Sequence, residues 1–223
     1  MTDAALYLRT YEADGSQSLS RDVRVRCEET LLVGASADEA FLLRVPQATA
    51  GRLVAHRFSD GAERTLAGLD GFDIDLLGRP LDLSTDASRL IAVGDGCQVE
   101  VLDVASGAVS PLDLAGVLDD CRRLDRLSLS PNGDRLAVTY ESDDELTVAV
   151  LDLPSGTVLL REVVGTAQSY AVSVPPTPFT YTAGIAWGDD STLRAAFVRI
   201  PPEFDSQVVA AADALDVLAF SVP

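Results

Sequence analysis

The sequence repeats one short pattern four times, and the spacing of the copies restricts the folds open to the chain. Each copy starts with Ser or Trp, has Asp or Asn two residues later and ends with Leu. The copies are Ser36–Leu42, Ser84–Leu90, Ser130–Leu136 and Trp187–Leu193. Four glycines follow the same period, since Gly15, Gly61, Gly107 and Gly156 lie 46, 46 and 49 residues apart. Two markers with one period predict an array of structural repeats.

The third copy shows most clearly what one repeat contains. Pro131 and Gly133 occupy the second and fourth positions of a type I turn, and Gly156 closes a second turn. The segments around these turns alternate between polar and apolar residues or are rich in β-branched ones, as strands are. The expected strands are 126–129, 135–140, 146–151 and 157–163. One repeat therefore contains four short antiparallel strands.

Four strands per repeat are typical of one blade of a β-propeller, in which blades stack around an axis and cover one another's faces. The turn Ser130–Gly133 and the strand endings Leu102-Asp103 and Leu151-Asp152 resemble those of WD-repeat and prokaryotic WD-like propellers. Leu stands where that family often has Trp, and the family's Gly-His pair is absent. The resemblance implies an all-β, propeller-like chain over most of residues 4–200.

We expect the chain to form a single domain of four to five four-stranded blades. The expected repeats are 1–27, 28–70, 71–121, 122–165 and 180–223, with insertions at 165–179 and 201–213. The first repeat has only a third and a fourth strand, so the N- and C-terminal strands are expected to share one blade. Residues 215–222 are a further candidate strand. The ring either closes in this way or leaves open strand edges that can pair with another chain.

The two insertions are expected to differ in structure. Prolines at 175, 176 and 178 favour an extended surface loop in the first. Residues 201–213 are expected to form a short helix that Asp205 or Ser206 caps. Binding function often lies in such loops.

The balance of charged residues limits the expected partners. Asp and Glu number 35 against 17 basic residues, all of them Arg, and the formal net charge is −18. A surface this negative repels phosphate groups, so neither nucleic acid nor a membrane is an expected partner. The absence of Lys excludes a Schiff-base or P-loop lysine. The expected partner is a protein with a basic face, bound less tightly in salt, or a second copy joined through open blade edges.

The cysteines and the start of the sequence bear on the compartment. Cys27, Cys97 and Cys121 are odd in number and form no C-x-x-C pair, so we expect small buried side chains without a disulfide framework. The first residues contain no basic region and no long apolar run. No stretch reaches the ~18 apolar residues of a membrane span. These features predict a soluble, cytoplasmic protein.

Residues that could carry chemistry are few. His56 is the only histidine, and no G-x-S-x-G motif accompanies it. An Asp or Asn that recurs in every repeat usually bonds nearby backbone N–H groups in a turn. The expected turn residues are Asp38, Asp86, Asn132 and Asp189, together with Gly15, Gly61, Gly107 and Gly156. We expect no catalytic residue, no cofactor and no metal.

Two functions from different classes remain. The first is a non-catalytic protein-interaction or scaffold propeller, alone or as a subunit of a larger assembly. The alternative is a small propeller hydrolase that uses a carboxylate pair, such as Asp73/Asp75 or Asp189/Asp190, or a bound divalent ion. A hydrolase would need several acids on the inner strands, where Asp82 and Arg126 are the charged residues expected. This favours the interaction protein and leaves the enzyme open.

Overall fold

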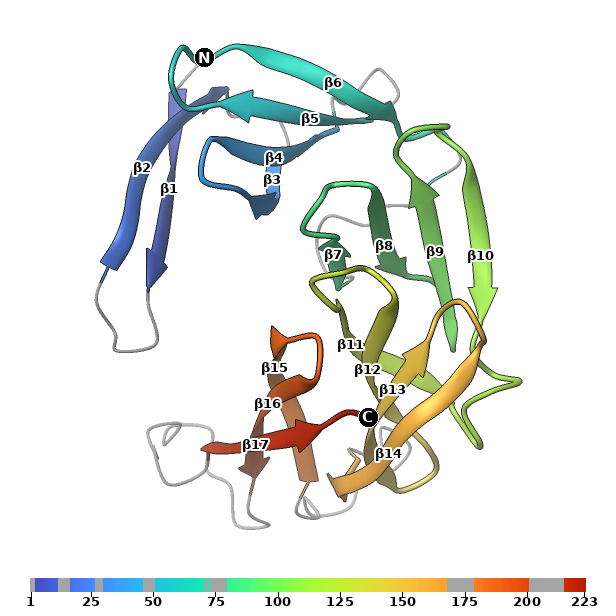
Figure 1. Ribbon diagram of the computed structural model, residues 1–223. Coiled ribbons are helices and arrows are strands. Elements are labelled where there is room, and N and C mark those ends of the chain that lie inside the picture. The colour runs from blue at the N-terminus through green and yellow to red at the C-terminus, as the bar shows by residue number, and fades with distance from the viewer. Residues whose placement is uncertain are drawn as a thin grey trace.

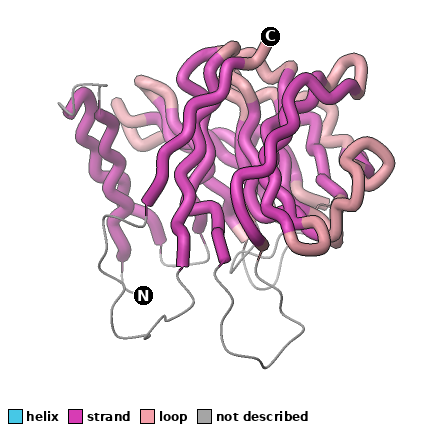
Figure 2. Tube along the Cα trace, turned by 90° about the horizontal axis from the view of Figure 1, so that it is seen from below, coloured by secondary structure: helices cyan, strands magenta, loops and turns pink. Residues whose placement is uncertain are grey.

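A computed structural model describes residues 3–11, 17–26, 30–45, 51–70, 72, 80–167, 179–200 and 215–223. Within these ranges the chain forms 17 strands in five antiparallel sheets and contains no helix. Figure 1 shows the sheets arranged one after another around a common centre, and Figure 2 shows the strands side by side from the edge. The prediction of an all-β, propeller-like array is confirmed.

The four larger sheets are numbered here as blades. Blade 1 contains β3 (Thr30–Ala35), β4 (Glu39–Arg44), β5 (Arg52–Arg57) and β6 (Glu63–Gly68). Blade 2 contains β7 (Leu81–Leu83), β8 (Arg89–Val93), β9 (Gln98–Asp103) and β10 (Val109–Asp113). Blade 3 contains β11 (Arg123–Leu129), β12 (Arg135–Glu141), β13 (Glu145–Asp152) and β14 (Thr157–Thr166). Blade 4 has three strands, β15 (Phe179–Asp189), β16 (Thr192–Ile200) and β17 (Leu215–Ser221).

The two ends of the chain do not share a blade, in contrast to the expectation from the sequence. β1 (Asp3–Tyr11) and β2 (Gln17–Arg26) form a two-stranded sheet of their own. The third strand of blade 4 is β17, which pairs with β16 so that Phe220 lies opposite Leu193. β17 takes the position expected for an N-terminal strand, and its Phe220 is buried in the core between blades 3 and 4.

The core lies between neighbouring blades. The motif residues Leu90, Leu136 and Leu193 are at most 1% exposed, and each packs against the preceding blade. Burial of one such side chain contributes about 1.5–3 kcal/mol. The repeated Leu is therefore the residue that joins each blade to the one before it.

The two insertions fall largely outside the described residues. β14 continues to Thr166 and β15 begins at Phe179, so both strands extend into the first insertion. The expected loop between them and the expected helix at 201–213 lie where the chain is not described.

Candidate functional site

The turn between the first two strands of blades 2 and 3 is built in the same way in both. In blade 2, Asp86 Oδ1 accepts hydrogen bonds from Ser84 Oγ at 2.7 Å and from the Ser88 N–H at 3.0 Å. Hydrogen bonds from Ser88 and then Ser84 lower the pKa of Asp86. In blade 3, Asn132 Oδ1 accepts from Ser130 Oγ at 2.7 Å. Both side chains thus hold a turn.

The outer copies of the motif use different contacts. In blade 1, Ser36 Oγ accepts from the N–H groups of Asp38 and Glu39 at 3.2 and 3.1 Å. In blade 4, Asp189 Oδ1 accepts from the backbone N–H and the hydroxyl of Ser191, both at 2.8 Å. Those bonds lower the pKa of Asp189. Trp187 replaces the serine, and its Nε1 donates to the Ser128 carbonyl of blade 3 at 3.1 Å.

The periodic glycines occupy a backbone conformation that favours glycine. Gly61, Gly107 and Gly156 have φ of +70°, +70° and +69°. Side chains disfavour this left-handed region, and glycine does not. The N–H of each glycine donates to the carbonyl of the residue four positions earlier. Gly15 lies outside the described residues.

Asp82 is an acidic residue of the innermost strands, and it is bonded within the protein. Its Oδ2 accepts from the Leu129 N–H at 2.8 Å and from Ser128 Oγ at 3.1 Å, both in blade 3. Its Oδ1 accepts from the Leu83 N–H at 2.9 Å. Burial raises the pKa of Asp82 although these hydrogen bonds oppose the shift. The carboxyl group therefore connects blade 2 to blade 3, a role that the sequence did not reveal.

A pocket of about 310 Å³ lies between blades 2 and 3. It is lined by Pro80, Val93, Gly94, Asp95, Gly96, Arg123, Leu124, Asp125 and Arg126. Charges of both signs meet there. Arg123 pairs with Glu141 at 2.6 Å, and Asp125 Oδ2 accepts from the Thr182 N–H of blade 4 at 3.3 Å. Arg123 and Asp125 are thus bonded within the protein, and Asp125 connects the blade 3 side of the pocket to blade 4.

A disulfide bond joins Cys97 to Cys121 beside this pocket, which corrects the expectation of unpaired cysteines. The two Cα atoms lie 6.1 Å apart although 24 residues separate them in sequence. Backbone bonds bring the segments together, because the Leu124 N–H donates to the Gly96 carbonyl and the Leu114 N–H to the Cys97 carbonyl. Such long-range proximity cannot be seen in the spacing of the cysteines. Cys27 lies outside the described residues.

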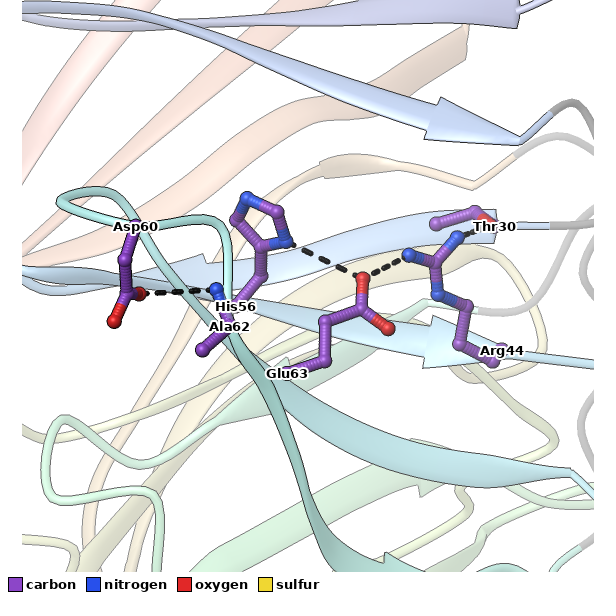
Figure 3. A network of polar contacts seen from close by, with 6 residues as sticks. All are labelled: Thr30, Arg44, His56, Asp60, Ala62 and Glu63. Carbon is purple, nitrogen blue, oxygen red and sulfur yellow. Dashed lines mark hydrogen bonds and ion pairs between the residues drawn. The ribbon is translucent and has the colours of Figure 1, made fainter.

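His56 belongs to a polar network on blade 1, which Figure 3 shows across four adjacent strands. Its Nδ1 lies 3.3 Å from Glu63 Oε1. Arg44 forms an ion pair with Glu63 and donates to Thr30 Oγ1 at 2.8 Å. Burial opposes ionisation of Glu63, but hydrogen bonds from Arg44 and His56 outweigh it and lower the pKa of Glu63. The histidine thus takes part in a polar network on a strand surface.

Several acids from the neighbouring acid pairs of the sequence are bonded within the protein. Asp119 pairs with Arg161 at 2.5 Å, and Asp143 pairs with Arg122. Asp190 Oδ1 accepts from the Asn132 N–H at 3.0 Å. Asp73 and Asp75 lie outside the described residues. Among the residues that the structure describes, no three His, Cys, Asp or Glu side chains are grouped so that they could hold a metal ion. The described part also contains no helix that could span a membrane.

No described residue of another blade covers one face of blade 4. The residue after the motif Leu is buried against the next blade in blades 1 to 3, where it is Leu43, Ile91 or Ala137. Its counterpart in blade 4, Arg194, is exposed. The strand register places Ala219 opposite Arg194, Val217 opposite Ala196 and Leu215 opposite Val198. Val217 is 62% exposed and Leu215 49%. We call Arg194, Ala196, Val198, Leu215, Val217 and Ala219 the open face.

The strand order and the stacked blades define the chain as an all-β protein with a β-propeller arrangement. No protein-family model matches the sequence, and no curated protein matches it. Solved structures match at low identity. TolB from Acinetobacter baumannii matches with a TM-score of 0.46 and 14% identity over 89% of this chain and 46% of TolB. Hsv2p from Kluyveromyces lactis matches with a TM-score of 0.44 and 12% identity over 95% of this chain and 62% of Hsv2p.

A third match is the tricorn protease, with a TM-score of 0.43 and 11% identity. It covers 74% of this chain and 15% of the protease. The chain thus spans about half of TolB and a smaller part of the protease. The assignment to the propeller class rests on the pairing of the strands and the packing of the blades in this chain itself.

Proposed function

We propose that the protein is a non-catalytic scaffold whose open face on blade 4 is covered by another protein surface. The observation that carries the proposal is the exposure of Leu215 and Val217 on a blade face whose counterparts in blades 1 to 3 are buried. Blades of a repeat array stabilise one another by covering such faces. A strand face with large exposed apolar residues marks a site of association.

The state of the inner-strand carboxyl group supports a role without catalysis. A hydrolase of the carboxylate type needs an acid free to meet the substrate and a second one nearby. Asp82 instead accepts three hydrogen bonds from the backbone and Ser128. Its engagement between two blades favours the scaffold over the hydrolase.

The net charge of −18 supports a partner whose contact surface is basic. Complementary charge speeds the encounter of two proteins, and salt screens it. The same charge disfavours nucleic acid and anionic membranes as partners. We therefore propose that binding of a different protein weakens as the salt concentration rises.

A binding experiment with two matched variants tests the proposal. The chain is immobilised and exposed to an extract of its own cells, and the retained protein is purified and titrated against the free chain. Val198→Lys places a positive charge on the open face, and Val163→Lys places the same charge on β14, where Val163 is 52% exposed. The expected result is binding that Val198→Lys weakens at least tenfold and Val163→Lys leaves unchanged. Equal binding by both variants, or no protein that binds the purified chain, would contradict the proposal.

A further inference from the structure

Among the residues that the structure describes, β17 is a third strand without a fourth. In blades 1 to 3 the third strand pairs on its outer side with β6, β10 or β14. In blade 4 the sheet order is β15-β16-β17, so in the described part of the chain β17 pairs on one side alone. The N–H and C=O groups on the outer side of such an edge can pair with an added strand.

The other outer strands carry features that block added strands, and β17 has few of them. β6 begins with Glu63 and Arg64, and β10 contains Pro111, which cannot donate a backbone hydrogen bond. β14 contains Arg161 and Glu162. Charged residues and proline are the usual protection of a sheet edge against pairing.

The single charge within β17 is neutralised by its neighbour. Asp216 forms an ion pair with Arg199 of β16 at 2.6 Å. The remaining residues of β17 are apolar except for Ser221 at its end. Two of its apolar residues, Leu215 and Val217, are about half exposed or more. The edge is therefore apolar, close to neutral and unprotected.

We propose that β17 pairs antiparallel with β17 of a second copy of the chain, around a twofold axis at Val217. The proposal goes beyond the proposed function, because it concerns the outer edge of β17 and not the open face of blade 4. In this register Val217 faces Val217 of the second copy, and Leu215 faces Ala219 of the second copy. Asp216 faces Leu218, so the two carboxylates do not meet. Apolar cross-strand pairs of this kind stabilise a sheet.

The sequence of the strand is what selects a second copy as the occupant. An isologous contact needs a surface that is complementary to itself. β17 meets this condition since each apolar residue of its exposed side faces another apolar residue in the antiparallel register. The joined blades form one sheet of six strands. In this register residues 215–219 of the two copies pair, and five residues per copy are far fewer than the roughly 20–30 residues that each partner contributes to a standard interface. The dimer is therefore expected to depend on protein concentration.

Salt separates this dimer from binding to a basic partner. Two copies that each carry a charge of −18 repel one another, and salt screens that repulsion. Self-association is therefore strengthened by salt, whereas binding to a basic face is weakened. The opposite signs allow one titration to tell the two contacts apart.

The first test measures molar mass by sedimentation equilibrium, from about 1 to about 300 µM protein, the range in which weak interfaces fill. We expect a rise from 23.6 kDa towards twice that mass, at lower protein concentration in high salt. Val217→Lys, which charges the edge, is expected to raise the dissociation constant at least tenfold. The control Val163→Lys, on β14, is expected to leave it unchanged. A mass of 23.6 kDa throughout, or a dimer unaffected by Val217→Lys, overturns the proposal.

The second test checks the register without relying on a destabilising substitution. In a Cys27→Ala background, Val217→Cys is expected to form a disulfide-linked dimer on mild oxidation, because the register places the two residues opposite each other. Asp216→Cys faces Leu218 and is expected to link far more slowly. Equal linking of both variants overturns the proposed register. If a different protein binds the open face while the chain stays monomeric, the self-pairing fails and the proposed scaffold function stands.

Discussion

At the scale of single residues, Asp82 shows how an acid on an inner strand is used for assembly. Its carboxyl group, which belongs to blade 2, accepts hydrogen bonds from the Leu129 N–H and the Ser128 hydroxyl of blade 3. Trp187 contacts the same position from blade 4 through the Ser128 carbonyl. Ser128 is therefore a point at which three blades meet.

We predict that Asp82→Ala lowers the free energy of unfolding by about 1–3 kcal/mol, because the Leu129 N–H loses its partner. The exposed Glu162→Ala is the control and is expected to change it by less than about 0.5 kcal/mol. Urea unfolding followed by circular dichroism measures both. An effect of Asp82→Ala as small as that of the control would show that the carboxyl group does not join the blades.

The turn carboxylates predict how stability responds to acid. Hydrogen bonds from Ser106 lower the pKa of Asp103 below 3.8, and those from Ser155 and Ser88 do the same for Asp152 and Asp86. A lowered folded-state pKa stabilises the fold above the unfolded value, and this contribution is lost as the pH falls through the folded-state pKa. Burial raises the pKa of Asp82, so the titration of this group favours the folded state more at low pH than at high pH.

We therefore predict that the urea midpoint falls as the pH is lowered through and below the unfolded value of 3.8. Asp86→Asn is expected to flatten this dependence, because the group no longer titrates. Val163→Ala, which removes no titrating group from an exposed position, serves as the control with an unchanged slope. Midpoints measured at several pH values in that range decide the matter, and a midpoint that rises with acid would contradict the account.

At the scale of elements, the repeat pattern predicted the strands of blades 2 and 3 well, because each strand has its own turn and its own motif Leu. It also indicated a strand at 215–222, close to the observed β17. The repeat pattern did not predict how the two ends of the chain join. The alternation of polar and apolar residues identifies a strand, but it does not identify the strand with which it pairs. The Cys97–Cys121 bond was missed for a related reason: contacts between loops depend on the path of the whole chain.

The disulfide bond makes a prediction about this element of the structure. Replacing both Cys97 and Cys121 by Ser is expected to lower the free energy of unfolding by about 3 kcal/mol, the value for a closed loop of this length. Thiol titration of the unfolded, unreduced protein is expected to find one free thiol, that of Cys27.

Three free thiols in protein taken directly from cells would contradict the bond and would fit the cytoplasmic location, which stays a prediction. Disulfide bonds of this kind are typical of oxidising compartments. The thiol count therefore tests the bond and the expected location together.

At the scale of the whole molecule, the fourth blade of the array differs from the other three. The first three blades have four strands and a face covered by the next blade, whereas the described residues of blade 4 form three strands with an open face. Composition and repeat pattern could predict the array, but exposure of its last face depends on where the N-terminal strands lie. The function proposed here follows from that exposure.

The measurement that tests the central claim most directly is amide hydrogen exchange of residues 215–221 in dilute and in concentrated protein at high salt. An edge strand leaves alternate N–H groups open to water, and an added strand protects them. We predict rapid exchange at alternate positions of β17 in dilute protein and at least tenfold slower exchange in concentrated protein. β13, which is paired on both sides, is expected to exchange slowly in both. Slow exchange of β17 already in dilute monomer would show that its edge is covered, and would contradict the account.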